Sequence, residues 1–149
     1  MAKIPVLTPA VAATIEEACL CLSTQRAARV IGRRYDATLR PTGLSNWQFG
    51  LLMMLVRDEA PTISELAHDL ATDRTTITAN LKPLERRGLL EIQADTEDRR
   101  VRRIVLTNEG RAVLTEALPL WEKAQAACTE QLGKIDQNAF RAAVSALSA

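Results

Sequence analysis

Residues 62–107 read TISELAHDLATDRTTITANLKPLERRGLLEIQADTEDRRVRRIVLT, and they contain the clearest structural pattern in the chain. Its first half repeats apolar residues at helical spacing, and Thr62 and Asp73 stand where N-cap residues would begin two short helices. Gly88 stands where a helix commonly ends in a left-handed residue. Two short helices joined by a turn of about three residues form a helix-turn-helix. The first half of the stretch therefore predicts this motif.

The second half predicts a β-hairpin with a long, charged tip. Leu90 and Ile92 alternate with polar residues in one segment, and Ile104 and Leu106 alternate with other residues in a second. The connection at residues 95–100 is too long and too charged for a two-residue turn. We expect it to project into solvent as a wing, which makes the whole stretch a winged helix-turn-helix.

Further helices are predicted on both sides of this unit. Between Pro9 and Leu39 the sequence has no further proline and a single glycine, which predicts one long helix or two in close succession. Ser45 begins a capping box and an apolar helix that continues to about Arg57. Thr107 can cap a second long helix, in which Pro119 is a candidate kink, and residues 139–147 predict a short final helix.

These elements predict a fold class that is mainly α with a small β-hairpin. We expect a single unit over residues 1–149, in which residues 45–110 form the winged helix-turn-helix DNA-binding region. The flanking helices of residues 8–44 and 111–149 exceed what a small core requires, and the first carries an apolar stripe that can pack on a partner helix. They are therefore predicted to form a helical dimerisation region.

Charge is unevenly distributed, although the net charge of the chain is only +1. Residues 74–103 contain eight arginines and lysines against five acidic residues, and residues 26–40 contain five arginines against one aspartate. A local positive field attracts a phosphate backbone more than the total charge does. Double-stranded DNA is therefore the expected partner.

Other classes of function lack their characteristic residues. The only histidine, His68, has no metal or catalytic partners, and the sequence contains no glycine-rich phosphate loop, so we expect no enzyme, no metal site and no cofactor. No apolar run approaches the roughly 18 residues of a membrane-spanning helix, and residues 1–13 lack the apolar core of a signal peptide. We expect a cytoplasmic protein with no membrane partner.

The second helix of a helix-turn-helix lies in the major groove, where its first residues and its polar face meet the bases. Arginine pairs with guanine, threonine hydrogen-bonds a base or touches a thymine methyl, and lysine suits a phosphate. Four hairpin arginines, Arg103 among them, can enter the minor groove or contact the backbone. The predicted DNA-binding residues are Ser64, Arg74, Thr75, Thr76, Thr78, Ala79, Lys82, Arg99, Arg100 and Arg102.

One alternative and one irregularity in the predicted recognition helix qualify this interpretation. A winged helix can serve only for protein contacts, although such a module would not need basic residues on its wing. Pro83 lies inside the predicted recognition helix, so we expect that helix to bend or to end nearby.

Four segments together resemble the motifs of the MarR family: ISELA at 63–67, TTITANLKPLERRG at 75–88, DRR at 98–100 and LTNEG at 106–110. They match that family in order and spacing, and the resemblance extends over essentially the whole chain. It implies a homodimer with interlocking first and last helices that binds a pseudo-palindromic operator, usually as a repressor released by a small molecule or an oxidant. It also implies that Asp98 orients the wing through a salt bridge and that Arg100 reaches the minor groove.

The three cysteines are expected to be reduced thiols, because an odd number is a poor disulfide framework. Cys19 and Cys21 lie about 200° apart around a regular helix, which disfavours a shared metal ion. Cys19 follows the apolar stripe and is predicted to be a core residue.

The placement of Cys21 resembles the organic-peroxide-sensing branch of the MarR family, in which tyrosines of the partner chain hydrogen-bond a first-helix cysteine. This resemblance implies a sensing role for Cys21 and Tyr35, with Gln25 at the position of a second tyrosine. Cys128 is a candidate resolving thiol. The alternative is that all three thiols only fill space in the packing.

Aromatic residues suggest where an effector would bind. Trp47 and Phe49, together with Tyr35 and Trp121, are candidates to line a cavity between the dimer helices and the winged unit. Such a cavity would accept a small aromatic effector. Packing of these side chains in the core is the alternative.

Overall fold

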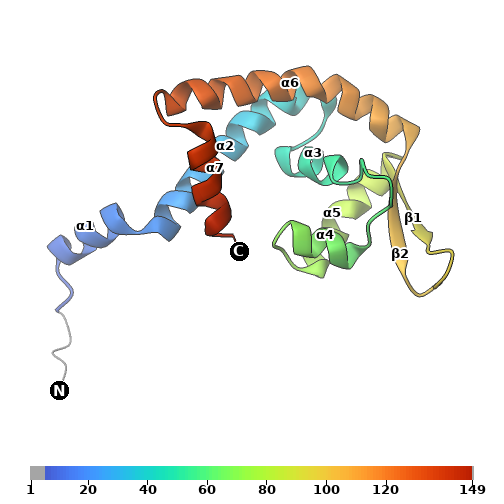
Figure 1. Cartoon of the computed structure of the whole chain (residues 1–149), viewed down its shortest axis with the longest axis horizontal. Coiled ribbons are helices and arrows are strands. Elements are labelled where there is room, and N and C mark those ends of the chain that lie inside the picture. The colour runs from blue at the N-terminus through green and yellow to red at the C-terminus, as the bar shows by residue number, and fades with distance from the viewer. Residues whose placement is uncertain (1–5, 149) are drawn as a thin grey trace.

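A computed structural model of the chain describes residues 6–148, and this part is mainly helical with a two-stranded antiparallel sheet (Figure 1). The predicted fold class is confirmed. In chain order the elements are α1 (Pro9–Ala18), α2 (Leu20–Leu39), the 3-10 helix η1 (Arg40–Thr42), α3 (Asn46–Met53), α4 (Ile63–Asp69), α5 (Arg74–Arg86), β1 (Leu90–Ala94), β2 (Arg102–Leu106), α6 (Asn108–Leu132) and α7 (Gln137–Ala146).

The predicted N-caps begin the helices of the helix-turn-helix. The Thr62 hydroxyl accepts a hydrogen bond from the Glu65 N–H at 3.2 Å, and the Glu65 carboxylate accepts one from the Thr62 N–H at 2.7 Å, so α4 starts with a complete capping box. The Asp73 carboxylate caps α5 by accepting from the Thr76 N–H at 2.8 Å. Gly88 adopts φ +70° directly after Arg87, the C-cap residue of α5. Local sequence therefore sets both ends of the recognition helix.

The hairpin follows the predicted alternation. Leu90 pairs with Leu106 and Ile92 with Ile104, and Leu90 and Ile104 are completely buried. The Ile104 N–H donates to the Pro61 carbonyl at 2.9 Å, which ties β2 to the segment before α4. Gly110, in the first turn of α6, lies so close to the hairpin that an added Cβ would overlap the Leu89 carbonyl oxygen. The hairpin is thus fixed at its base and extended at its tip.

The core joins the helix-turn-helix to the long helices. Ile77, Leu81 and Leu84 of α5 are all completely buried, as predicted for the inner face of that helix. Further completely buried residues come from α2, α3, α4 and the hairpin, namely Leu39, Leu51, Leu52, Leu66, Leu90 and Ile104. Burial of such side chains contributes about 1.5–3 kcal/mol each to folding.

The first long helical segment forms two helices in close succession. This is one of the two arrangements predicted from the sequence. Cys19 separates α1 from α2 with an extended ψ of 105°, and its sulfur accepts the Leu22 N–H at 3.4 Å as the N-cap of α2. Cys19 is half-buried at this break and is not a core residue of the single chain, because α1 contains no buried residue and the only buried residue of α2 is Leu39 at its far end. In Figure 1, α1 extends away from the rest of the chain, while α2 packs along α6.

Some boundaries differ from the sequence-based expectation. Helix α3 ends at Met53, before Arg57, because the chain continues in tight turns, with the N–H groups of Leu55 and Val56 bonded to carbonyls three residues earlier. Helix α5 contains Pro83 and ends three residues later, and α6 continues without a break through Pro119. Within residues 6–148, every helix is too short or too polar to span a lipid bilayer.

Candidate nucleic-acid interface

The outer face of α5 presents most of the predicted base-contacting residues. Five of them line one shallow depression, namely Arg74, Thr75, Thr78, Ala79 and Lys82. The hydroxyl of Thr76 is used by the cap, since it donates to the Asp73 carboxylate at 2.7 Å. These hydrogen bonds hold the pKa of Asp73 below its usual value, so the cap stays ionised at neutral pH. Ser64 is exposed in the first turn of α4.

The wing carries three exposed arginines, Arg99, Arg100 and Arg102. Figure 1 shows the hairpin beside α4 and α5, with its base at the start of α6 and its tip pointing away from α6. Among residues 6–148, no carboxylate pairs with these three guanidiniums or with Arg74 and Lys82. We refer to these five cations as the free cation set. Their charge is therefore available to an anionic partner.

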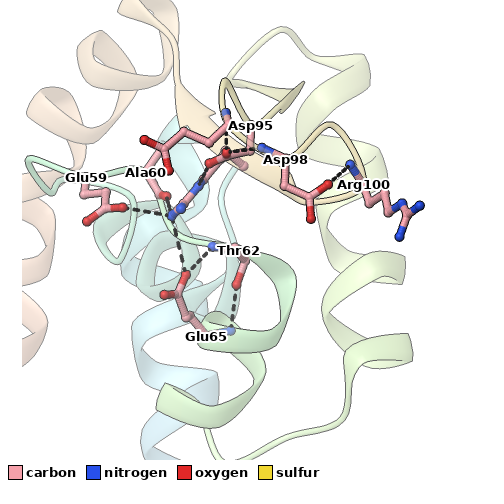
Figure 2. Close-up of polar contacts among 9 residues, drawn as sticks. Glu59, Ala60, Thr62, Glu65, Asp95, Asp98 and Arg100 are labelled. Carbon is pink, nitrogen blue, oxygen red and sulfur yellow. Dashed lines mark hydrogen bonds and ion pairs between the residues drawn. The ribbon is translucent and has the colours of Figure 1, made fainter.

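Arg103 has a different environment from its wing neighbours. Its Nε donates to the Asp95 carboxylate at 2.7 Å, and its Nη1 donates to the Ala60 carbonyl at 2.9 Å (Figure 2). The same guanidinium lies 3.3 Å from the Glu59 carboxylate and 3.9 Å from that of Glu65. The expectation that all four hairpin arginines face DNA is therefore wrong for Arg103, which joins the wing to the chain before α4.

Asp95 is the anchor of the wing turn. One carboxylate oxygen accepts the N–H groups of Glu97 at 2.8 Å and Asp98 at 3.0 Å, and the other accepts Arg103. The Asp98 N–H, the Arg103 guanidinium and the Glu97 N–H together lower the pKa of Asp95 to about 2. These bonds favour the charged form, so the anchor is ionised throughout the physiological pH range.

Asp98, predicted to orient the wing through a salt bridge, makes a different contact. Its carboxylate accepts the Arg100 N–H at 2.9 Å, and among the described residues the wing salt bridge belongs to Asp95 and Arg103 (Figure 2). The Arg100 side chain extends away from this cluster in Figure 2. Asp98 therefore shapes the local turn that presents Arg100, while Asp95 holds the hairpin.

Glu65 has two roles, one in capping α4 and one in binding Arg103, and the sequence indicated only the first. Its carboxylate completes the α4 capping box and also faces Arg103. Hydrogen bonding from Thr62 is the main reason that the pKa of Glu65 lies below its usual value, with Arg103 contributing. The capping-box spacing indicated the first role, but no pattern in the sequence indicated the second.

Comparison with known proteins assigns the family. The MarR family model matches residues 44–101, which include both helices of the helix-turn-helix, β1 and the tip of the wing. The chain is also similar to the transcriptional regulator MosR of M. tuberculosis, known in complex with DNA. The two are 42% identical with a TM-score of 0.79, over 87% of this chain and 93% of MosR. The chain belongs to the MarR family. The resemblance seen in its sequence motifs is confirmed.

Two curated relatives of this MarR-family chain come from Bacillus subtilis (strain 168). The uncharacterized HTH-type transcriptional regulator YdgJ is 31% identical over 64% of this chain and 57% of its own length. The organic hydroperoxide resistance transcriptional regulator is 27% identical over 68% of this chain and 69% of its own. The chain thus spans little more than half the length of YdgJ.

The predicted sensing residues of the MarR-family chain lie in two places. Cys21 is exposed on α2, where its sulfur accepts from the Gln25 side chain at 3.1 Å. Tyr35 and Cys128 instead lie together between α2 and α6. The Tyr35 hydroxyl donates to the Gln125 side chain at 2.6 Å, and Arg34 approaches the Cys128 sulfur at 3.6 Å. Within one chain, the structure therefore groups Cys128 with Tyr35 and leaves Cys21 apart.

A cavity of about 640 Å³ adjoins this second group. Its lining comes from α2, α6 and α7 and includes Tyr35, Trp121, Cys128, Phe140 and Arg141. Burial is the main reason that the pKa of Tyr35 lies above its usual value, with the nearby Cys128 thiol adding to it, so the phenol remains a hydrogen-bond donor.

The other two pocket candidates lie elsewhere. Phe49 is 7% exposed within the core, and Trp47 packs against that core. The buried indole N–H of Trp47 has no hydrogen-bond partner among the described residues. In the same part of the chain, no group of three or more His, Cys, Asp or Glu side chains is arranged to hold a metal ion.

Proposed function

We propose that this MarR-family protein is a homodimeric, sequence-specific DNA-binding repressor of transcription without enzymatic activity. The observation that carries the proposal is the free cation set, five unpaired cations presented by the outer face of α5 and by the wing. The similarity to MosR, whose structure contains DNA, supports the same conclusion. A helix of this kind enters the major groove, while flanking arginines fit the narrower minor groove.

The contacts are divided between the two surfaces. Arg74 suits a guanine edge because it begins the recognition helix, and Lys82 suits a phosphate further along the same face. Thr75, Thr78 and Ala79 lie between them, where short side chains allow the helix to approach the bases closely. Arg99, Arg100 and Arg102 contact the minor groove or the backbone, while Ser64 reaches a phosphate from α4.

The remaining helices form the dimer interface in this proposal, with residues 8–44 and 111–149 as the dimerisation region and residues 45–110 as the DNA-binding region. Their apolar side chains support it, because a monomer would leave many of them in water. The exposed large apolar residues of these two regions are Val11, Ile15, Leu20, Leu22, Val30, Ile31, Leu118, Ile135, Phe140, Val144 and Leu147. A second copy would bury this surface, and the two-fold axis would match a pseudo-palindromic operator.

The test is binding of the full-length protein to duplexes that cover the DNA upstream of its own gene. Fluorescence anisotropy should detect one preferred site, with affinity falling steeply as salt rises. Arg100→Ala should weaken binding to that site at least about tenfold, which corresponds to about 1.4 kcal/mol. Lys134→Ala removes an exposed charge near the start of α7 and serves as the matched control. Equal binding by wild type and Arg100→Ala would contradict the wing contact.

Release from DNA is proposed to follow an effector. The cavity beside Tyr35 and Trp121 has a volume in the range of small-molecule sites, which supports an aromatic ligand. Exposure of Cys21, and the similarity to the hydroperoxide resistance regulator, support oxidation instead.

Ligand binding and thiol oxidation are distinguished by measuring the affinity of the protein for its operator in the presence of aromatic acids and of an organic hydroperoxide. Loss of the peroxide response in Cys21→Ser, but not in Cys19→Ser, supports oxidation. A peroxide response retained in Cys21→Ser contradicts it. Binding of aromatic acids that Trp121→Ala abolishes supports the ligand, and unchanged operator affinity at saturating acid contradicts it.

A further inference from the structure

Arg87 connects the recognition helix α5 to the end of α2, which belongs to the proposed dimerisation region and is called the dimer arm below. It is the C-cap residue of α5, directly after the last helical residue. Its Nη1 donates to the Gly43 carbonyl at 2.8 Å, and its Nη2 donates to the Thr42 carbonyl at 3.3 Å. Both carbonyls belong to the turn that ends α2. One side chain therefore joins the ends of two helices that are 44 residues apart in sequence.

The turn that receives Arg87 is firmly held. The Gly43 N–H donates to the Arg40 carbonyl at 3.0 Å, and the Thr42 hydroxyl donates to the Leu39 carbonyl at 2.8 Å. Leu39 and Leu44, on either side, are 0% and 3% exposed. Gly43 adopts φ +68°, and a Cβ on it would lie 3.3 Å from Arg87 Nη2. The guanidinium thus lies against a fixed turn that accommodates it closely.

Arg87 supplies the direct polar link between these two parts of the molecule. Among residues 6–148, the only hydrogen bonds that join α5 and its C-cap to α2 or η1 are the two from Arg87. Helix α5 otherwise packs mainly on α4 and β1. The angle between α5 and α2 therefore depends on the shared apolar core and on this bidentate contact, which adds directional hydrogen bonds to the packing.

We propose that Arg87 is a positioning residue that fixes the recognition helix relative to the dimer arm and so determines which half-site spacing the protein accepts. This inference rests on the proposed function. Helix α5 has 13 residues and is about 20 Å long. A swing of about 10° at its C-terminal end moves its N-terminal end by about 3.5 Å over that length. This is close to one base-pair step of about 3.4 Å.

The chemistry of the contact distinguishes positioning from simple charge. A guanidinium donates to two carbonyls at once, whereas a lysine ammonium keeps the charge but not the planar bidentate geometry. Arg86 is the matched neighbour: it is exposed and makes no hydrogen bond through its side chain within the described residues. A charge effect should be the same for both arginines, but a positioning effect should belong to Arg87 alone.

The experiment measures the affinity of the full-length protein for its preferred operator and for versions with one or two base pairs added or removed between the half-sites. Wild type, Arg87→Ala, Arg87→Lys and Arg86→Ala are compared by anisotropy, with melting temperatures recorded for each. We expect wild type and Arg86→Ala to prefer one spacing. Both Arg87 variants should lose about tenfold of that preference, while the salt slope of Arg87→Lys stays at the wild-type value.

Two results would overturn the proposal. A wild-type spacing preference in Arg87→Lys would reduce the role of Arg87 to its charge. A loss of the same factor at every spacing in Arg87→Ala, together with part of its salt slope, would place Arg87 on a phosphate. A wild-type protein that binds no duplex would instead contradict the proposed function itself, so the two failures are distinguishable.

Discussion

Arg102 and Arg103 are neighbours in β2 whose side chains leave the strand on opposite sides, and we expect their replacement by alanine to have different effects. Arg102 is exposed and belongs to the free cation set. Arg103 is bound to Asp95, Ala60 and Glu59. Arg102→Ala should therefore change the electrostatics of DNA binding. Arg103→Ala should instead loosen the wing.

The size of the first effect follows from the free cation set. Five cations in each protomer give about ten in a dimer, and if each displaces one counterion the slope of log affinity against log salt is about −9. Arg102→Ala removes two of the ten and should reduce the slope to about −7. Between 50 and 200 mM salt, the loss of affinity then falls from roughly 10⁵-fold to roughly 10⁴-fold.

Arg103→Ala should leave the slope near the wild-type value, because its charge is already matched by nearby carboxylates. Its affinity should be lower by a similar factor at every salt concentration, and its melting temperature should fall. Anisotropy titrations over a salt series and thermal unfolding measure these quantities, with Lys134→Ala as the control. A slope that falls equally in both variants, with the melting temperature of Arg103→Ala unchanged, would refute the division of roles.

Two further predictions concern stability. The pKa of Asp95 is lowered to about 2 in the folded protein, so its contribution to stability is fully present above its unfolded value of 3.8 and is lost as pH falls through about 2. Urea titration measures the difference in unfolding free energy between wild type and Asp95→Asn. This difference should therefore be constant from pH 7 to about 5 and should shrink towards pH 2. A difference that grows in acid would contradict the role of Asp95 in holding the wing. Gly110→Ala places a Cβ against the Leu89 carbonyl oxygen and should destabilise the protein by at least about 2 kcal/mol, whereas Gly50→Ala meets nothing within 4 Å and should be neutral or slightly stabilising. Equal melting temperatures for these two variants would show that α6 is not held against the hairpin base.

Local interactions explain why so much of the fold could be predicted. The caps at Thr62, Asp73 and Thr107 each bond an N–H three residues ahead, so the groups that start α4, α5 and α6 are neighbours in the chain. The alternation in β1 and β2 is likewise a short-range pattern that reports which side faces the core. The motif set of residues 63–110 therefore predicted both the winged helix-turn-helix and its family.

Contacts between distant residues explain what could not be predicted. Arg99, Arg100, Arg102 and Arg103 look equivalent in sequence, yet only Arg103 meets the Ala60 carbonyl, 43 residues away. The same holds for Tyr35 and Gln125, 90 residues apart, and for the cavity beside them. The position of Trp47 and Phe49 relative to that cavity also depended on how α3 packs against α2 and α6.

Local sequence is enough to predict where the helices of the winged unit begin, which faces are apolar and which surface is basic, because these properties depend on residues within about four positions of one another. Three-dimensional packing is needed to show which arginines are free and which are bound, because a charge can be neutralised by a carboxylate or carbonyl from any part of the chain. Arg103 and Arg87 are both part of the basic pattern, but folding directs each of them to backbone carbonyls of a distant segment. What remains exposed on α5 and the wing is the surface available to DNA.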